Sequence, residues 1–116
     1  MKAIVIDVQS NTLICGANGG NAYLSPGDRI RWKSADRRLP FTLEFFRLGL
    51  EADGECIEVS SLDRWPFADP PEPKRGIVGP TTEFKATLKK KGGAAFKYTV
   101  TVGNLRLDPI IIVDRH

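Results

Sequence analysis

The chain has 116 residues, of which 41% are hydrophobic, and these values predict a single domain, residues 1–116, that can fold without a disulfide. Lysine and arginine number 17 against 14 aspartate and glutamate, and a net charge of +3 is too small to indicate nucleic acid as a partner. No apolar run approaches the roughly 20 residues of a membrane span. No signal-peptide pattern follows Met1 either, so we expect a cytoplasmic protein without membrane contact.

The first part of the chain alternates apolar and polar residues over short stretches, as β-strands do. Residues 3–8 are predicted to form a first strand, and 11–15 a second strand or a continuation of the first beyond a bend. A glycine-rich loop and a turn over 23–28 then lead into a strand over 29–33, in which Trp32 faces the core.

Residues 41–48 alternate again, and the glycines of 49–54 are predicted to close a hairpin into 56–59. The pattern then fails over 62–80, which holds five prolines. Such a stretch predicts a long connection without regular structure, which serves either as a functional loop or as a flap over the body of the domain. Trp65 near its start is predicted to pin it down.

Strand patterns return at 82–89 and, after a turn rich in lysine and glycine, at 96–102. The second of these is predicted to be a central strand, and a reversal at 103–104 follows it. The four β-branched residues of 110–113 form an uninterrupted apolar run, which predicts a final strand buried on both faces. No stretch of a dozen residues has helical spacing. The fold class predicted is therefore an all-β, antiparallel Greek-key β-sandwich of seven or eight strands.

Two segments resemble the cupredoxin pattern. Residues 25–33 (SPGDRIRWK) and 39–43 (LPFTL) are similar to the family's Pro-Gly-Asp turn, its strand, and the Pro-His step that opens the next strand. Phe84, Gly93 and 96–100 are similar to the later segment in which an aromatic strand leads to the copper cysteine. The resemblance implies a cupredoxin-like sandwich, and an immunoglobulin-like sandwich remains the alternative.

The residues that match the family's copper ligands are not ligands here. Phe41 stands at the position of the first histidine and Val100 at that of the cysteine, and 103–107 contains neither histidine nor methionine. A blue-copper centre needs two imidazoles and a thiolate, whereas His116 is the single histidine of the chain. We therefore expect no metal and no other cofactor, with apolar packing at Phe41.

We also expect no catalytic residues, and hence no enzyme. A triad would have to use His116, at the end of the chain. Paired carboxylates remain open, because the sequence does not place four candidates, Asp36, Glu44, Glu58 and Asp63. The two cysteines, Cys15 and Cys56, are predicted to be buried, unpaired thiols rather than a disulfide.

These exclusions favour a non-catalytic binding or interaction module whose partner is another protein, or a second copy of the chain. We expect the contact surface to be the segment 62–80 or an exposed sheet edge, which can recruit a further strand or self-associate. The candidate contact residues lie in that segment and in the lysine-rich turn: Trp65, Phe67, Lys74, Arg75, Lys89, Lys90 and Lys91. Nucleic acid is a weaker alternative, because no aromatic residues alternate with these lysines. Another alternative is a small-ligand or carbohydrate-binding domain that uses Trp65 and Phe67 as an exposed aromatic platform.

Overall fold

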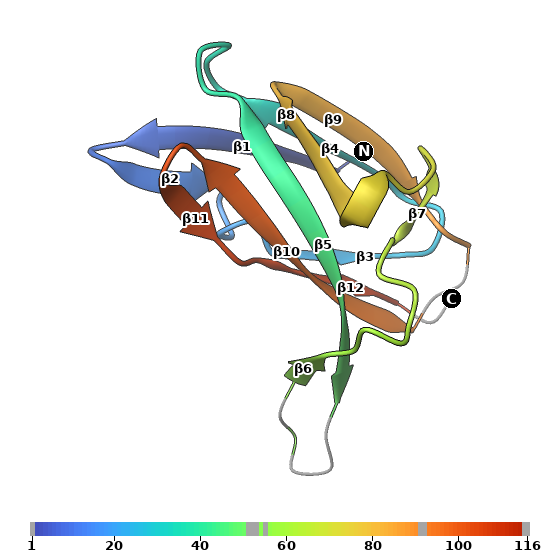
Figure 1. The fold of residues 1–116 in the computed structure, drawn as a ribbon. Helices are drawn as coiled ribbons and strands as arrows, with labels where there is room; N and C mark the ends of the chain where they lie inside the picture. The colour runs from blue at the N-terminus through green and yellow to red at the C-terminus, as the bar shows by residue number, and fades with distance from the viewer. Residues whose placement is uncertain (1, 51–53, 55, 91–92, 115–116) are drawn as a thin grey trace.

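The computed structural model describes residues 2–50, 54, 56–90 and 93–114. Within them the chain forms twelve strands and one 3₁₀ turn, η1 (Lys74–Gly76), and the strands make two sheets (Figure 1). None of the described residues belongs to a helix long and apolar enough to cross a membrane.

The first sheet has the strand order β2-β1-β4-β9-β7. Its strands are β2 (Thr12–Cys15), β1 (Lys2–Gln9), β4 (Arg29–Ser34), β9 (Glu83–Leu88) and β7 (Phe67–Asp69). The pair β1–β4 is parallel, with Ile4 opposite Trp32, and the other pairs are antiparallel.

The second sheet has the order β3-β12-β10-β5-β6, with β11 against β10 and β8 against β5. Its strands are β3 (Ala22–Leu24), β12 (Ile110–Val113), β10 (Ala94–Val102), β5 (Phe41–Leu50), β6 (Cys56–Glu58), β11 (Leu105–Leu107) and β8 (Ile77–Thr81). Strand β3 runs parallel to β12, with Tyr23 opposite Ile112. The long antiparallel pair β10–β5 forms the centre of this sheet.

Period-two alternation explains which residues fill the space between the sheets. Every second residue of β4, of β5 as far as Phe45, and of β10 from Phe96 onward is buried, so each strand gives one face to the core. Trp32 of the first sheet meets Tyr98 and Phe45 of the second edge-on, with ring centroids 5.3 and 5.8 Å apart. One aromatic cluster thus joins the two sheets, in the edge-to-face geometry that aromatic rings prefer.

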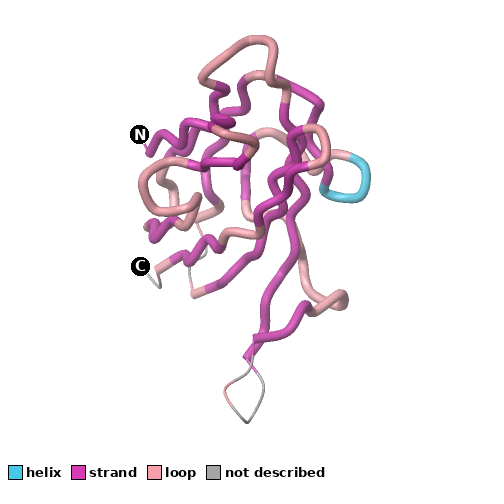
Figure 2. The backbone as a smooth tube through the Cα atoms, turned by 90° about the vertical axis from the view of Figure 1, so that its left-hand side faces the viewer, coloured by secondary structure: helices cyan, strands magenta, loops and turns pink. Residues whose placement is uncertain are grey.

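The C-terminal end of β5 and its hairpin partner β6 extend beyond the rest of the sheets. Figures 1 and 2, two views a quarter-turn apart, both show this pair projecting from the body. Leu48 is opposite Glu58 and Gly49 is opposite Ile57, so the predicted hairpin into 56–59 is confirmed. Residues 51–53 and 55 of its connection lie outside the described residues.

The predicted β-sandwich is confirmed, and it differs from the prediction in two details. It contains four more strands, β3, β7, β8 and β11, which have only three to five residues each, too few for a clear alternating pattern. Its sheets are mixed rather than antiparallel, since β1–β4 and β12–β3 are parallel.

The prediction that 62–80 lacks regular structure is wrong. Strand β7 pairs with β9, and β8 pairs with β5, so the segment adds one strand to each sheet. Its prolines hid this, because proline is tolerated at strand edges and bulges, and the register of both pairs is irregular. The segment is a flap over the aromatic core. The predicted turn over 23–28 is also wrong in part, since it includes the end of β3. The predicted reversal at 103–104 is confirmed, and β11 follows it.

Candidate interaction surface

The two aromatic residues of the predicted contact set are core residues. Trp65 is 3% exposed and Phe67 1%, and their rings meet edge-to-face at 5.1 Å. The Trp65 indole Nε1–H donates a hydrogen bond of 2.9 Å to the Pro70 carbonyl. The prediction that these rings form an exposed platform is therefore wrong, because their apolar area is used to hold the flap on the core. Trp65 pins the flap, as expected.

The basic residues of the predicted set do not gather on one surface. Lys74 and Arg75 are exposed on η1, whereas Lys89 and Lys90 follow β9. The Lys89 ammonium donates to the Asp63 carboxylate, which anchors the first residues of the flap. Lys90 is exposed, and Lys91 lies outside the described residues. The described members of the predicted set therefore do not form one exposed site.

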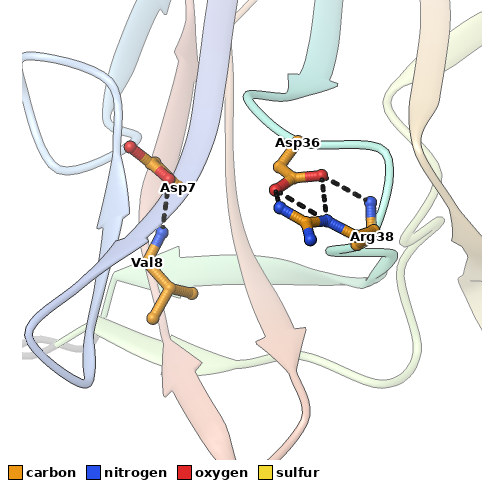
Figure 3. Close-up of polar contacts among 4 residues, drawn as sticks. All are labelled: Asp7, Val8, Asp36 and Arg38. Carbon is orange, nitrogen blue, oxygen red and sulfur yellow. Dashed lines mark hydrogen bonds and ion pairs between the residues drawn. The ribbon is translucent and has the colours of Figure 1, made fainter.

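The four carboxylates that the sequence left open each contact a basic side chain. Asp36 binds the neighbouring Arg38 through several hydrogen bonds, including a 2.9 Å bond from the guanidinium (Figure 3). The other three pairs are Glu44–Arg64, Glu58–Lys97 and Asp63–Lys89. The Arg38 and Lys89 hydrogen bonds lower the pKa values of Asp36 and Asp63. A general acid needs the opposite shift.

Figure 3 also shows a carboxylate that accepts a hydrogen bond from a backbone amide. Asp7 Oδ1 accepts a 2.8 Å hydrogen bond from the amide of Val8 in β1. Among the described residues no group of three or more His, Cys, Asp and Glu side chains could hold a metal ion.

The positions that match copper ligands in the cupredoxin pattern lie on three adjacent strands. Phe41 and Val100 are fully buried on β5 and β10, and Leu107 of β11 packs against the core opposite Val100. Leu43 is also opposite Val100, so these side chains share the inner face of the second sheet. The expected apolar packing at Phe41 is therefore what the structure shows.

The two cysteines differ in environment. Both are free thiols, but Cys15 is buried and Cys56 is exposed on β6. Burial raises the pKa of the Cys15 thiol to about 11. The prediction of burial is thus right for Cys15 and wrong for Cys56, because β6 extends past the cover of the other sheet.

The exposed apolar side chains that sequence reasoning missed lie on the outer face of β3 and β12. Tyr23 is 69% exposed, Ile112 43% and Ile110 37%, and we call these three residues the β3–β12 patch. A shallow hollow of about 390 Å³ lies over the patch and over Asn18, Asn21 and Ala22. A second hollow, of about 510 Å³, extends from Tyr23 and Ile112 past Ala95 to Leu48 and Cys56.

This patch overturns one prediction directly. The final strand was expected to be covered on both faces, yet Ile110 and Ile112 face outward while Ile111 and Val113 are buried. A run of β-branched residues has no alternation from which to tell an inner from an outer face. An uninterrupted apolar run therefore does not distinguish a strand buried on both faces from a strand whose outer face is exposed.

Charged side chains cover the neighbouring part of the same face. On β5 the Phe46 ring has the Lys97 ammonium 4.7 Å and the Arg64 guanidinium carbon 5.0 Å from its centroid. Lys97 in turn pairs with Glu58 of β6. Cations over an aromatic face are stabilising. The outer face of β5 is therefore covered by charged side chains, whereas the β3–β12 patch is exposed.

Strand β3 also ends the sheet order, so the patch lies at a sheet edge. The amide of Asp114 donates to the Leu24 carbonyl, which shows that Leu24 hydrogen-bonds toward β12. Because backbone groups of successive residues point to opposite sides of a strand, the N–H and C=O of Tyr23 point to the open edge. The flanking amides are occupied locally, since Asn21 donates to the Asn18 carbonyl and Ser25 to Asp28 Oδ2. The edge therefore offers one donor and one acceptor, both from Tyr23.

No protein-family model matches the chain, and no curated protein matches it. Among solved structures the chain is similar to two mutants of the cupredoxin amicyanin, one a reduced Cu(I) form at pH 4 and the other an oxidised form. Each is 14% identical, with a TM-score of 0.38, over 94% of this chain and 81% of that chain. At this TM-score the likeness has no weight for function. The chain is a two-sheet β-sandwich by its own strand order and shared core.

Proposed function

We propose that the chain is a non-catalytic, copper-free, cupredoxin-like module that binds protein through the β3–β12 patch. The observation that carries the proposal is the exposure of Tyr23, Ile110 and Ile112 side by side at a sheet edge. An unpaired edge strand next to exposed apolar side chains is a surface to which another strand can add.

Two observations support the non-catalytic and copper-free parts of the proposal. The carboxylates that could have formed a catalytic pair are each bound to a cation. The positions that match copper ligands are filled by Phe41, Val100 and Leu107 packed against one core. A reducing, cytoplasmic location is part of the proposal too, and the unpaired, exposed Cys56 thiol is consistent with it.

The partner that this edge fits best is a second copy of the chain. In an antiparallel hydrogen-bonded pair two residues exchange both of their N–H···O bonds. Two Tyr23 residues related by a two-fold axis would use the single donor and acceptor that each edge offers. A longer added strand would instead need the Asn21 and Ser25 amides, which are bonded locally. The two-fold contact would also place the two exposed Tyr23 rings against each other on one face.

Sedimentation velocity across a range of protein concentrations tests this proposal. We expect a reversible monomer–dimer equilibrium, weak because the patch is small beside the roughly 800 Å² per partner of a standard interface. Tyr23→Lys should abolish the dimer. Val5→Lys is the matched control, because Val5 is 49% exposed on the first sheet, away from the patch.

A wild-type chain that stays monomeric at millimolar concentration would exclude the second copy as partner. Dimerisation that persists in Tyr23→Lys would exclude the β3–β12 patch as the contact surface. The predicted loop site has its own test, a pull-down comparing the intact chain with a variant that lacks 70–75. Because that deletion removes the Pro70 carbonyl that holds Trp65, its folding must be verified first.

A further inference from the structure

Arg47 occupies an inward-facing position where the hydrophobic core ends. On β5 the inward residues are Phe41, Leu43 and Phe45, all fully buried, and Arg47 is next in the same alternation. Its cross-strand neighbour on β10 is the buried Phe96. A charged residue at this position places a guanidinium between the end of the second sheet and the flap.

The contacts of Arg47 leave one buried donor unused. The guanidinium carbon lies 5.3 Å from the centroid of the Phe96 ring, so the ring covers one face of the group. The Nε atom is buried, and no hydrogen-bond partner for it exists within the described part of the chain. A buried donor without an acceptor is unfavourable by about 1–3 kcal/mol. Because Nε itself has almost no exposed area, a ligand would contact the terminal nitrogens of the guanidinium.

A cavity of about 300 Å³ adjoins this group. Its lining is mostly apolar and aromatic, with Arg47 and one ion pair as the charged groups: Arg47, Asp63, Trp65, Pro66, Lys89, Ala94, Phe96 and Val113. The volume lies at the lower end of the range of about 300–1,000 Å³ for small-molecule sites. An apolar wall with a few polar groups is also typical of such sites.

The charges around the cavity favour an anion. Asp63 is neutralised by Lys89 and also accepts a 3.0 Å hydrogen bond from the Trp65 amide. The charge that remains on the wall is that of Arg47, which points to a carboxylate, the anion whose two oxygens match the donors of a guanidinium. Trp65 and Phe96 also line the cavity, but they are only 3% and 4% exposed, so they offer a ligand little apolar area.

We infer that this cavity is a site for a small monocarboxylate, held by the Arg47 guanidinium. None of Tyr23, Ile110 and Ile112 lines this cavity, although the larger hollow that begins at Tyr23 and Ile112 also reaches Arg47. Small-ligand binding was first expected on an exposed platform of Trp65 and Phe67, and this cavity is a different location for it. The proposal does not depend on self-association, and either can fail alone.

The probe for the test is sodium benzoate, with neutral benzamide as the matched control of the same shape. Two-dimensional ¹H–¹⁵N spectra of the full chain, recorded at constant ionic strength, report the Arg47 Nε–H, the Phe96 amide and the Trp65 indole N–H separately. We expect benzoate to shift these signals saturably, and benzamide to bind at least about tenfold more weakly, since hydrogen bonds to charged groups contribute about 1.5–3 kcal/mol. The signals of Tyr23 and Ile112 should not move.

Two variants complete the test. Arg47→Gln should weaken benzoate binding at least about tenfold, whereas Arg106→Gln, which removes an exposed arginine on β11, should leave it unchanged. Arg47→Lys keeps the charge without the planar fork and should give an intermediate loss. Equal shifts with benzoate and benzamide in the wild-type chain would overturn the inference, and this comparison holds even if Arg47→Gln does not fold. The absence of saturable shifts at Arg47, Phe96 and Trp65 would overturn it as well.

Discussion

Removing one buried hydroxyl tests how the two sheets are joined. Tyr98 is fully buried on β10, and its hydroxyl donates a hydrogen bond to the carbonyl of Gly20. Gly20 lies in the connection from β2 of the first sheet to β3 of the second. The bond therefore ties the crossing segment to the central strand of the second sheet.

Tyr98→Phe removes the hydroxyl, while the ring and its contacts with Trp32 and Phe45 remain. The hydroxyl also interacts with the Cys15 thiol, and the variant removes that hydrogen bond too. What is lost is the donor to a carbonyl inside the protein, and an unsatisfied buried acceptor costs about 1–3 kcal/mol. We expect the free energy of unfolding to fall by that amount. For a chain of this size each kcal/mol corresponds to a decrease in Tm of about 4 °C.

Urea denaturation followed by tryptophan fluorescence measures the change. The slope against urea should be unchanged, since the variant exposes the same surface on unfolding. The chain has two tyrosines, and Tyr23→Phe is the matched control: its side chain is exposed and the substitution should change stability by less than about 0.5 kcal/mol. If Tyr98→Phe were as stable as the control, the hydroxyl could not be what holds the crossing segment.

Three further outcomes follow from the same region and from the thiols. A Cβ on Gly20 would lie 2.8 Å from Tyr98 Oη at a φ of +88°, so Gly20→Ala should lose about 2 kcal/mol or more in urea denaturation. Gly19→Ala, at φ +65° in open space, should lose only about 1 kcal/mol. With Ellman's reagent the native chain should show one reactive thiol, Cys56, and a second only after unfolding, and two fast thiols would contradict the burial of Cys15. Burial raises the pKa of Cys15 from 9.0 to about 11, so the unfolded chain loses this proton at a lower pH than the native chain. The free energy of unfolding should therefore fall by about 2–3 kcal/mol between pH 9 and 11. Cys15→Ala should reduce this fall.

Alternation in the sequence predicted the centre of the molecule well. The strands over 29–33, 41–48 and 96–102 appear as β4, β5 and β10, with Trp32 in the core as expected. These strands have one buried and one exposed face along most of their length, and such strands alternate apolar and polar residues in the sequence. Their burial could therefore be predicted from the chain alone.

The sequence did not show where each strand is covered, and the contact surface depends on that. The isoleucines of 110–113 and the single exposed Tyr23 carry no periodic signal that separates an inner face from an outer one. The parallel partners of β1 and β12 were also missed, because parallel pairing depends on a crossover that brings distant segments together. The order of strands in the sheet was needed to place Tyr23 at an edge.

The two proposed sites have a common structural origin, which argues that neither is an accident of composition. Strand β5 continues its inward alternation past the end of the core, so the next inward side chain, Arg47, lies at a cavity instead of in packed protein. Strand β12 keeps an apolar residue at every position although its outer face has no cover, so Ile110 and Ile112 lie at the surface. In both cases an ordinary rule of strand patterning is broken at the margin of the second sheet, by a charge at an inward position of β5 and by apolar side chains at outward positions of β12. Residues that break a local rule without a structural benefit are where function is expected, and the dimerisation and benzoate experiments test the two margins independently.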